Sequence, residues 1–165
     1  MPQTRKLRIL FLCTGNSCRS QMAQGWARHL KDDIIEPYSA GTQPVPLNPN
    51  AVRVMAEAGV DISTHRSKHV IEMKDTDFDY IVTVCDQARE SCPYFPGKGK
   101  VIHVDFDDPP HLAATAKNEK EMLDCYRRVR DEIRKFIETL PETLDRSDKK
   151  RQMFRGPEQS TGVQT

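Results

Sequence analysis

The feature that most constrains the fold is a short apolar run near the N-terminus that leads directly into a helical pattern. Residues 7–12 are almost continuously apolar, as is typical of a strand buried in the centre of a parallel sheet. From Ser20 onward the apolar residues recur at helical spacing. They are Met22, Ala23, Trp26, Ala27 and Leu30. We therefore expect a strand, a tight loop and a helix in direct succession.

Strands and helices alternate along the rest of the chain. Apolar and β-branched residues predict strands at 80–84 and 101–104, and a weaker strand near Tyr38. A long amphipathic helix over 122–140 is ended by Pro141. This alternation predicts an α/β fold with a parallel sheet and helices on both faces, in which ligands bind where the strands end.

A shorter helix is marked by signals at both of its ends. Asn48 is a favourable N-cap, and Pro49 is favourable at the first helical position. Gly59 is typical of the left-handed residue that follows the end of a helix.

Size and composition indicate one soluble domain. The 165 residues suffice for one core, and 37% hydrophobic and 30% charged residues are usual for soluble proteins. A net charge of +1 provides no basic field for nucleic acid, and no apolar run reaches a membrane span or a secretory signal. We expect a cytoplasmic monomer without nucleic-acid or membrane partners, with a single domain over residues 1–143 and a flexible polar tail over 144–165.

The segment between the first strand and the first helix carries the chemistry. It reads Cys13-Thr14-Gly15-Asn16-Ser17-Cys18-Arg19-Ser20. A loop in this place points backbone N–H groups inward, Gly15 permits a conformation that other residues resist, and Arg19 grips two oxygens of a tetrahedral anion. The same surroundings, with a hydrogen bond from Ser20, are expected to lower the pKa of Cys13. The loop predicts a nucleophile beneath a bound, phosphate-like oxyanion.

A proton donor for the leaving oxygen is expected near this loop. Asp107 and Asp108 follow the strand at 101–104, and Pro109 stiffens the chain behind them. Because the carboxyl ends of parallel strands share one edge of the sheet, either carboxylate would arrive at the loop. Spacing alone favours an ordinary acidic turn over a general acid.

Together these motifs resemble the thioredoxin-coupled arsenate reductases, which share the fold of the low-molecular-weight protein tyrosine phosphatases. The resemblance runs in order from about residue 7 to residue 138. Its matching stretches are Phe11 to Ala23, Tyr38 to Gly41, Leu47 to Val52, Gly59 to Ser63, Val82 to Cys85, Cys92-Pro93, Phe106 to Pro109 and Arg128 to Ile133.

The resemblance implies a single-domain, four-stranded parallel sheet flanked by helices, and it assigns roles to particular residues. Cys13 becomes the nucleophile, Arg19 an oxyanion ligand and Asp108 the general acid. Cys85 and Cys92 become the second and third redox cysteines. Oxyanion binding is implied for Thr14, Gly15, Asn16, Ser17, Cys18, Arg19 and Ser20. The implied substrate is arsenate, with reduced thioredoxin as electron donor and no metal or other cofactor.

The resemblance also implies a relay in which a Cys13–Cys85 disulfide is exchanged for a Cys85–Cys92 disulfide. This exchange makes a physical demand on the segment between Cys85 and Cys92. If residues 86–91 are helical in the reduced protein, Cys85 and Cys92 lie about 10 Å apart along the helix axis, whereas a disulfide needs Cα atoms within about 7 Å. We therefore predict that oxidation disorders residues 85–92. Cys125 is interpreted as structural, and Cys18 as a packing residue, with an off-path disulfide to Cys13 as its alternative.

One departure from the family concerns a cation. Some members bind potassium beside the loop through an asparagine, a glutamate, a serine and an aspartate. The corresponding residues here are Asn16, Gln24, Ser39 and Lys68. Since a hard cation needs anionic oxygen ligands, we expect the Lys68 ammonium to occupy the place of the ion.

Two other functions compete with arsenate reduction. A low-molecular-weight tyrosine phosphatase would use Cys13, Arg19 and Asp108 in the same roles with water as second nucleophile, but it leaves the pair Cys85 and Cys92 unexplained. A thiol sensor or zinc module would use that pair together with a histidine such as His103. The six-residue gap between the two cysteines is unlike the short pairs of structural zinc sites.

Overall fold

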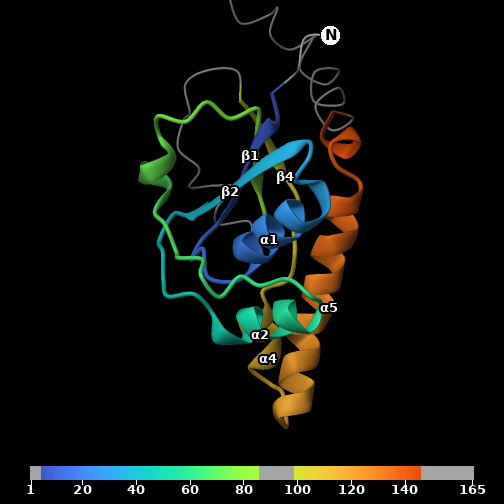
Figure 1. Ribbon diagram of the computed structural model, residues 1–165. Helices are drawn as coiled ribbons and strands as arrows, with labels where there is room; N and C mark the ends of the chain where they lie inside the picture. The colour runs from blue at the N-terminus through green and yellow to red at the C-terminus, as the bar shows by residue number, and fades with distance from the viewer. Residues whose placement is uncertain (1–4, 86–98, 146–165) are drawn as a thin grey trace, which may run out of the picture.

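The computed structural model describes residues 5–85 and 99–145 (Figure 1). The strands are β1 (Leu7–Cys13), β2 (Ile35–Gly41), β3 (Tyr80–Thr83) and β4 (Lys100–His103). The helices are α1 (Arg19–Lys31), α2 (Pro49–Glu57), the 3-10 turn η1 (Val70–Met73), α4 (Pro109–Ala113) and α5 (Glu119–Glu138). Each strand and helix predicted within the described residues is therefore present, and α4 and η1 are additions that the periodicity did not indicate.

The four strands form one parallel sheet in the order β2-β1-β3-β4. The apolar run of β1 is central: Phe11 is in register with Ser39 of β2 on one side and with Val82 of β3 on the other. Residues 9–12 are fully buried, as a strand with neighbours on both edges requires. The predicted α/β fold class is thus confirmed.

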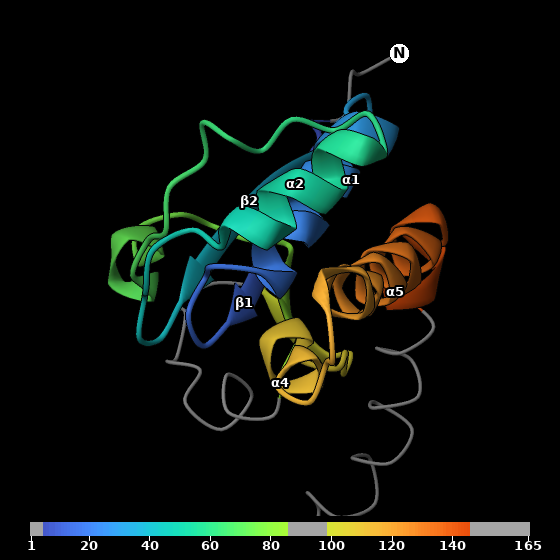
Figure 2. The ribbon, with the colours of Figure 1, turned by 90° about the horizontal axis from the view of Figure 1, so that it is seen from below.

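The helices pack against this sheet and against one another. Helix α1 contacts β1, β2 and α5, and α5 also contacts α2 and α4 (Figure 2). The Trp26 indole N–H of α1 donates to the Arg130 carbonyl of α5 at 3.2 Å, which fixes the two longest helices side by side. The hydrophobic core continues to Leu144, which is fully buried. The rest of the predicted tail, from residue 146, lies outside the described residues.

The ends of α2 follow the local signals. The Asn48 side chain accepts hydrogen bonds from the backbone N–H groups of Asn50 and Ala51, and Pro49 begins the helix. Gly59 has a φ of 86°, the left-handed conformation that was expected there. Among the described residues, no helix has both the length and the apolar character that crossing a membrane requires.

Candidate functional site

The carboxyl ends of the strands meet at one edge of the sheet, where the loop of residues 13–20 (the oxyanion loop) connects β1 to α1. The backbone N–H of Val84, just after β3, donates to the Leu12 carbonyl at 2.9 Å. Phe106, after β4, donates in turn to the Val84 carbonyl at 3.3 Å. These bonds bring the segments that carry Cys85 and Asp108 to the edge where the oxyanion loop begins.

The oxyanion loop is held by its carbonyl oxygens, which are hydrogen-bonded outward at six consecutive residues, 13–18. Their donors, in loop order, are the N–H groups of Thr42, Gln43 and Val45, the Ser67 hydroxyl, and the N–H groups of Asn48 and Met22. In a trans peptide the C=O and the following N–H point in opposite directions. The N–H groups of residues 14–19 therefore point inward, which is the arrangement that binds an anion.

The Cys13 thiol lies inside this ring of N–H groups and is only 3% exposed. Its sulfur is 2.8 Å from the Ser20 hydroxyl and accepts the Asn16 N–H at 3.2 Å. Burial nevertheless raises the pKa of Cys13, although Ser20, Asn16 and the charge of Arg19 act to lower it. The predicted lowering is therefore wrong, because removing the thiol from water outweighs the donors around it.

Asn16 is the residue with the unusual backbone in this loop. Its φ is 49°, whereas Gly15 is not in the left-handed region, so the conformational role predicted for Gly15 belongs to Asn16. What Gly15 provides is space, since a Cβ there would lie 3.0 Å from the Val45 side chain. The Asn16 side chain is fully buried, where its Oδ1 accepts the Lys68 N–H at 2.8 Å and its Nδ2 donates to Ser20 at 2.8 Å.

A second glycine allows the end of β2 to approach the loop. A Cβ on Gly41 would lie 2.5 Å from the Thr14 carbonyl oxygen and 2.9 Å from the Asn16 nitrogen. No side chain fits at that distance. Gly41 belongs to the stretch Tyr38 to Gly41, which resembles the family. The sequence alone does not reveal its packing role, because the contacts with Thr14 and Asn16 join segments that are distant in the chain.

Arg19 connects the loop to the predicted general acid. Its guanidinium donates to the Phe106 carbonyl at 2.9 Å and lies 3.7 Å from a carboxylate oxygen of Asp108. Asp107 points elsewhere and pairs with Arg128 of α5. Asp108 precedes α4 without capping it through its side chain, and 45% of that side chain is exposed. Of the two aspartates, Asp108 is therefore the one that faces the oxyanion loop.

The second cysteine also reaches the loop. The Cys85 sulfur lies 3.3 Å from the hydroxyl of Thr14, the residue that follows Cys13, and Cys85 is 5% exposed. Cys92 and the segment 86–91, which the relay would have to unwind if it is helical, lie outside the described residues. Cys18 is buried and Cys125 is partly buried, and both are free thiols. Burial raises the pKa of the Cys18 thiol, which favours the packing role predicted for it.

The residues at the potassium position do not suit a metal cation, because the Lys68 ammonium lies there. The Lys68 ammonium donates to the Arg66 carbonyl at 2.9 Å and to the Ser39 hydroxyl at 3.4 Å. Ser39 in turn donates to the Gln24 amide oxygen at 2.6 Å. Burial is the main cause that lowers the pKa of Lys68 to about 8, so the group is charged at neutral pH. A positive charge thus already occupies the region in which a potassium ion would need carboxylates.

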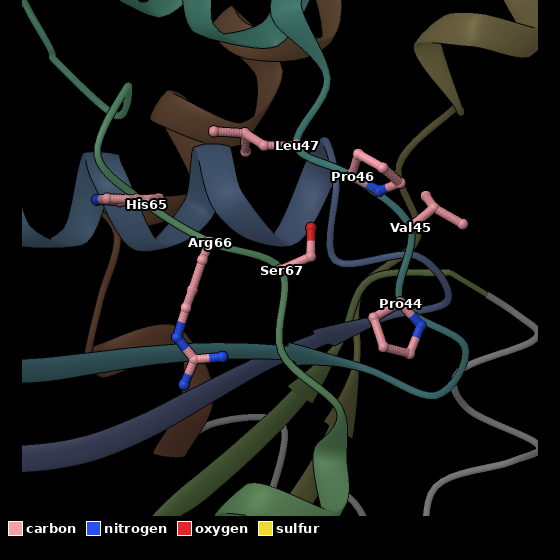
Figure 3. A pocket seen from close by; sticks show the side chains of 7 residues that line it. All are labelled: Pro44, Val45, Pro46, Leu47, His65, Arg66 and Ser67. Carbon is pink, nitrogen blue, oxygen red and sulfur yellow. The ribbon is translucent and has the colours of Figure 1, made fainter.

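Behind the oxyanion loop lies an open groove of about 470 Å³ between residues 44–47 and 65–67 (Figure 3). Val45 and Ser67, on its two walls, both donate to carbonyls of the loop, so the groove faces the loop's outer side and not the Cys13 sulfur. Across residues 5–85 and 99–145, no three His, Cys, Asp or Glu side chains are grouped to hold a metal ion.

The comparisons with known proteins agree with this geometry. The family model for the low molecular weight phosphotyrosine protein phosphatases matches residues 8–151. The chain therefore belongs to this family.

Within the family, relatives named as arsenate reductases are prominent. That of Halalkalibacterium halodurans is 44% identical over 135 residues, which cover 82% of this chain and 95% of the relative. A solved arsenate reductase in the phosphate-binding state has a TM-score of 0.64 at 26% identity, covering 81% of this chain and 95% of the other. A low-molecular-weight tyrosine phosphatase from T. tengcongensis has a TM-score of 0.66 at 28% identity, covering 84% and 99%. The predicted resemblance is confirmed.

Proposed function

We propose that this chain reduces arsenate to arsenite through Cys13, Cys85 and Cys92, with reduced thioredoxin as electron donor. The names of its relatives support the substrate. The observation that carries the reduction is the Cys85 sulfur, which lies 3.3 Å from the hydroxyl of Thr14. Hydrolysis of a phosphate ester needs no thiol at that position, because water completes the reaction.

The first step is nucleophilic attack within the oxyanion loop. Arg19 and the inward N–H groups of residues 14–19 bind the arsenate oxygens and stabilise their charge. The Cys13 thiolate attacks arsenic, an As–O bond breaks, and Asp108 protonates the departing hydroxide to give water. Asp108 suits this role because its carboxylate lies 3.7 Å from the Arg19 guanidinium and does not cap helix α4 with a side-chain hydrogen bond.

The second step transfers two electrons from the protein. The Cys85 thiolate attacks the Cys13 sulfur, the As–S bonding pair stays with arsenic, and arsenite leaves as a Cys13–Cys85 disulfide forms. Cys92 then attacks Cys85, which frees Cys13 and leaves a Cys85–Cys92 disulfide for the thioredoxin dithiol to reduce. Because Cys85 is 5% exposed, the segment around it must rearrange before thioredoxin reaches its sulfur. This need agrees with the predicted disordering of residues 85–92 on oxidation.

The second candidate is a tyrosine phosphatase, which the family membership favours. Cys13 would form a phosphocysteine, and Asp108 would first protonate the leaving group and then activate water. Arg19 would bind the phosphate. This function uses the same oxyanion loop and differs only in having no task for Cys85 and Cys92.

The deciding experiment is arsenate-dependent oxidation of NADPH in the presence of thioredoxin and thioredoxin reductase. The wild type and the control Cys125→Ser are expected to turn over many times. Cys92→Ser should release at most one equivalent of arsenite per chain, because Cys13 stays locked in a disulfide. Full activity of Cys92→Ser would reject the relay. A wild type that hydrolyses p-nitrophenyl phosphate but never oxidises NADPH would favour the phosphatase.

A further inference from the structure

We propose that His65, on a segment remote from the nucleophile, is a positioning residue that sets the direction of a hydrogen-bond chain ending on the Cys13 sulfur. The inference rests on the proposed function only in taking Cys13 as the nucleophile. The chain runs, from the surface inward, through Arg28, His65, Gln21, Asn16, Ser20 and Cys13. Each link has one possible polarity, because it is anchored by a group that can only donate or only accept.

The inner end is fixed by a backbone N–H. Lys68 N–H donates to one side-chain atom of Asn16 at 2.8 Å, so that atom is the amide oxygen. The amide nitrogen of Asn16 therefore faces Ser20 and donates to its hydroxyl at 2.8 Å. When Cys13 is a thiolate its sulfur can only accept, so the Ser20 hydroxyl, which accepts from Asn16, donates its own proton to the sulfur 2.8 Å away. A donor on the sulfur favours the thiolate and opposes the effect of burial.

The middle of the chain is fixed by two carbonyls. The side-chain nitrogen of Gln21 lies 3.1 Å from the Asn16 carbonyl oxygen and 2.9 Å from the Arg66 carbonyl oxygen, and it also donates to Asn16 Oδ1 at 3.1 Å. Carbonyls accept only, so the NH₂ group must be on this side. The amide oxygen of Gln21 consequently faces His65, and because Gln21 is fully buried this oxygen needs a donor.

His65 supplies that donor in one protonation state. Its Nδ1 lies 2.9 Å from the Gln21 oxygen and must carry a proton. Its Nε2 lies 3.3 Å from a guanidinium nitrogen of Arg28, which can only donate, so Nε2 must be unprotonated. The imidazole is therefore neutral, with its proton on Nδ1.

The charges around the ring favour the same state. Burial, followed by the positive charges of Arg28 on α1 and of Lys68, lowers the pKa of His65, while Asp61 acts in the opposite direction. In Figure 3 the ring lies in front of α1, with whose Gln21 and Arg28 it makes contact, while the neighbouring Arg66 side chain points away from that helix. The half-buried ring thus closes the chain at the surface of the protein.

Loss of the His65 donor would change the hydrogen bonding of the Cys13 sulfur through Gln21. An unpaired buried carbonyl oxygen is unfavourable enough to displace a flexible glutamine from its position. Asn16 would then lose the hydrogen bonds of Gln21 to its carbonyl and to its Oδ1, at a residue whose φ is already 49°, and the Lys68 N–H would be left to hold the amide. With that amide held less firmly, its hydrogen bond to Ser20 weakens, and the Ser20 proton is directed to the sulfur less often.

The tautomer is tested directly by long-range ¹⁵N–¹H correlation spectra of the histidine rings at pH 7. Assignment comes from the loss of one set of signals in His65→Asn. The expected pattern for His65 is a neutral ring protonated at Nδ1. A ring protonated at Nε2, or at both nitrogens, would overturn the proposal.

The effect on Cys13 is tested by its rate of alkylation with iodoacetamide, measured as a function of pH by mass spectrometry of the Cys13 peptide. In His65→Leu we expect alkylation near pH 7 to be about three- to fivefold slower, because the thiolate fraction falls. His65→Asn places an amide near the position of Nδ1 and should recover most of the wild-type rate. His29→Leu, the neighbouring surface histidine on α1, is the matched control and should match the wild type.

Two results would contradict this role. A folded His65→Leu variant that is alkylated at the wild-type rate would remove the connection to Cys13. Equal slowing in His65→Leu, His65→Asn and His29→Leu would indicate general loosening and not a directional chain. The assay uses no arsenate, so a protein that shows the expected rates but fails to reduce arsenate would retain the inference and lose the proposed function.

Discussion

The oxyanion loop and the opposite rim of the site, formed by residues 84–85 and 104–108, are built in contrasting ways. In the loop, each carbonyl from residue 13 to residue 18 has an outward partner, and Asn16 and Ser20 are fully buried. On the rim, Asp108 is half exposed and its side chain faces one partner, Arg19, at 3.7 Å. Cys85 is buried, and its sulfur lies 3.3 Å from the Thr14 hydroxyl of the loop.

This difference corresponds to the different demands on the two regions. Binding of a tetrahedral oxyanion benefits from dipoles that are already in place and do not reorganise during the reaction. In the proposed reaction, Asp108 and Cys85 must instead change partners within each catalytic cycle. The rigid loop is the part shared with phosphatases, and the proposed reduction depends on the rim.

The largest expected effect is that of replacing Cys85 on the rim, which should abolish arsenate reduction and leave the function of the oxyanion loop intact. In Cys85→Ser, arsenate turnover should fall at least about a thousandfold, because no disulfide can displace arsenite. Hydrolysis of p-nitrophenyl phosphate by the same variant should change less than about threefold, since the loop is intact. Parallel assays of both reactions measure this split. Equal losses in both would mean that Cys85 supports the loop itself.

A smaller effect, common to both reactions, is expected at the acid. Asp108→Asn should lower turnover of arsenate and of p-nitrophenyl phosphate by about a hundredfold to a thousandfold, because the leaving oxygen loses its proton donor. Asp107→Asn is the matched control. Its exposed pair with Arg128 contributes little, so the rate should stay within about twofold. Similar losses of turnover in Asp108→Asn and Asp107→Asn would contradict the assignment of Asp108, and not Asp107, as the general acid.

The rigidity of the loop is tested at Gly41. In Gly41→Ala the added methyl would lie 2.5 Å from the Thr14 carbonyl oxygen, and moving the loop should reduce phosphate affinity about tenfold. The free energy of unfolding should fall by about 1–3 kcal/mol. Gly59→Ala serves as the control. The alanine would be strained by the φ of 86° at this position, but its methyl group would meet no neighbouring atom, so the free energy of unfolding should fall without loss of phosphate affinity. Calorimetric titration with phosphate and urea unfolding measure the two quantities.

The smallest expected effect is that of potassium. Since Lys68 is protonated at pH 7, replacing potassium with sodium should change turnover less than about twofold. Its pKa of about 8 also predicts that oxyanion affinity declines as the pH rises through 8, because the lysine loses its charge. The double variant Gln24→Glu with Lys68→Asp should gain activation by potassium. Several-fold activation of the wild type would disprove the role given to Lys68.

Much of the fold could be predicted from the sequence because the signals are local. The buried run at 7–12 becomes the central strand, and Asn48 and Gly59 mark the ends of α2 as expected. Helix α4 was missed because a five-residue helix is too short to show a periodicity. In the candidate site, residues 13–19 were found from their position between a strand and a helix.

The sequence by itself determined the order of the elements and the place of Cys13 at the end of β1, since backbone preferences and apolar periodicity act over a few residues. Tertiary structure decided that Asp108 and not Asp107 faces the loop, that Asn16 and not Gly15 takes the left-handed conformation, and that burial raises the pKa of Cys13. It also decided that His65 reaches Gln21. These outcomes depend on which distant segments exclude water from, or donate hydrogen bonds to, the oxyanion loop.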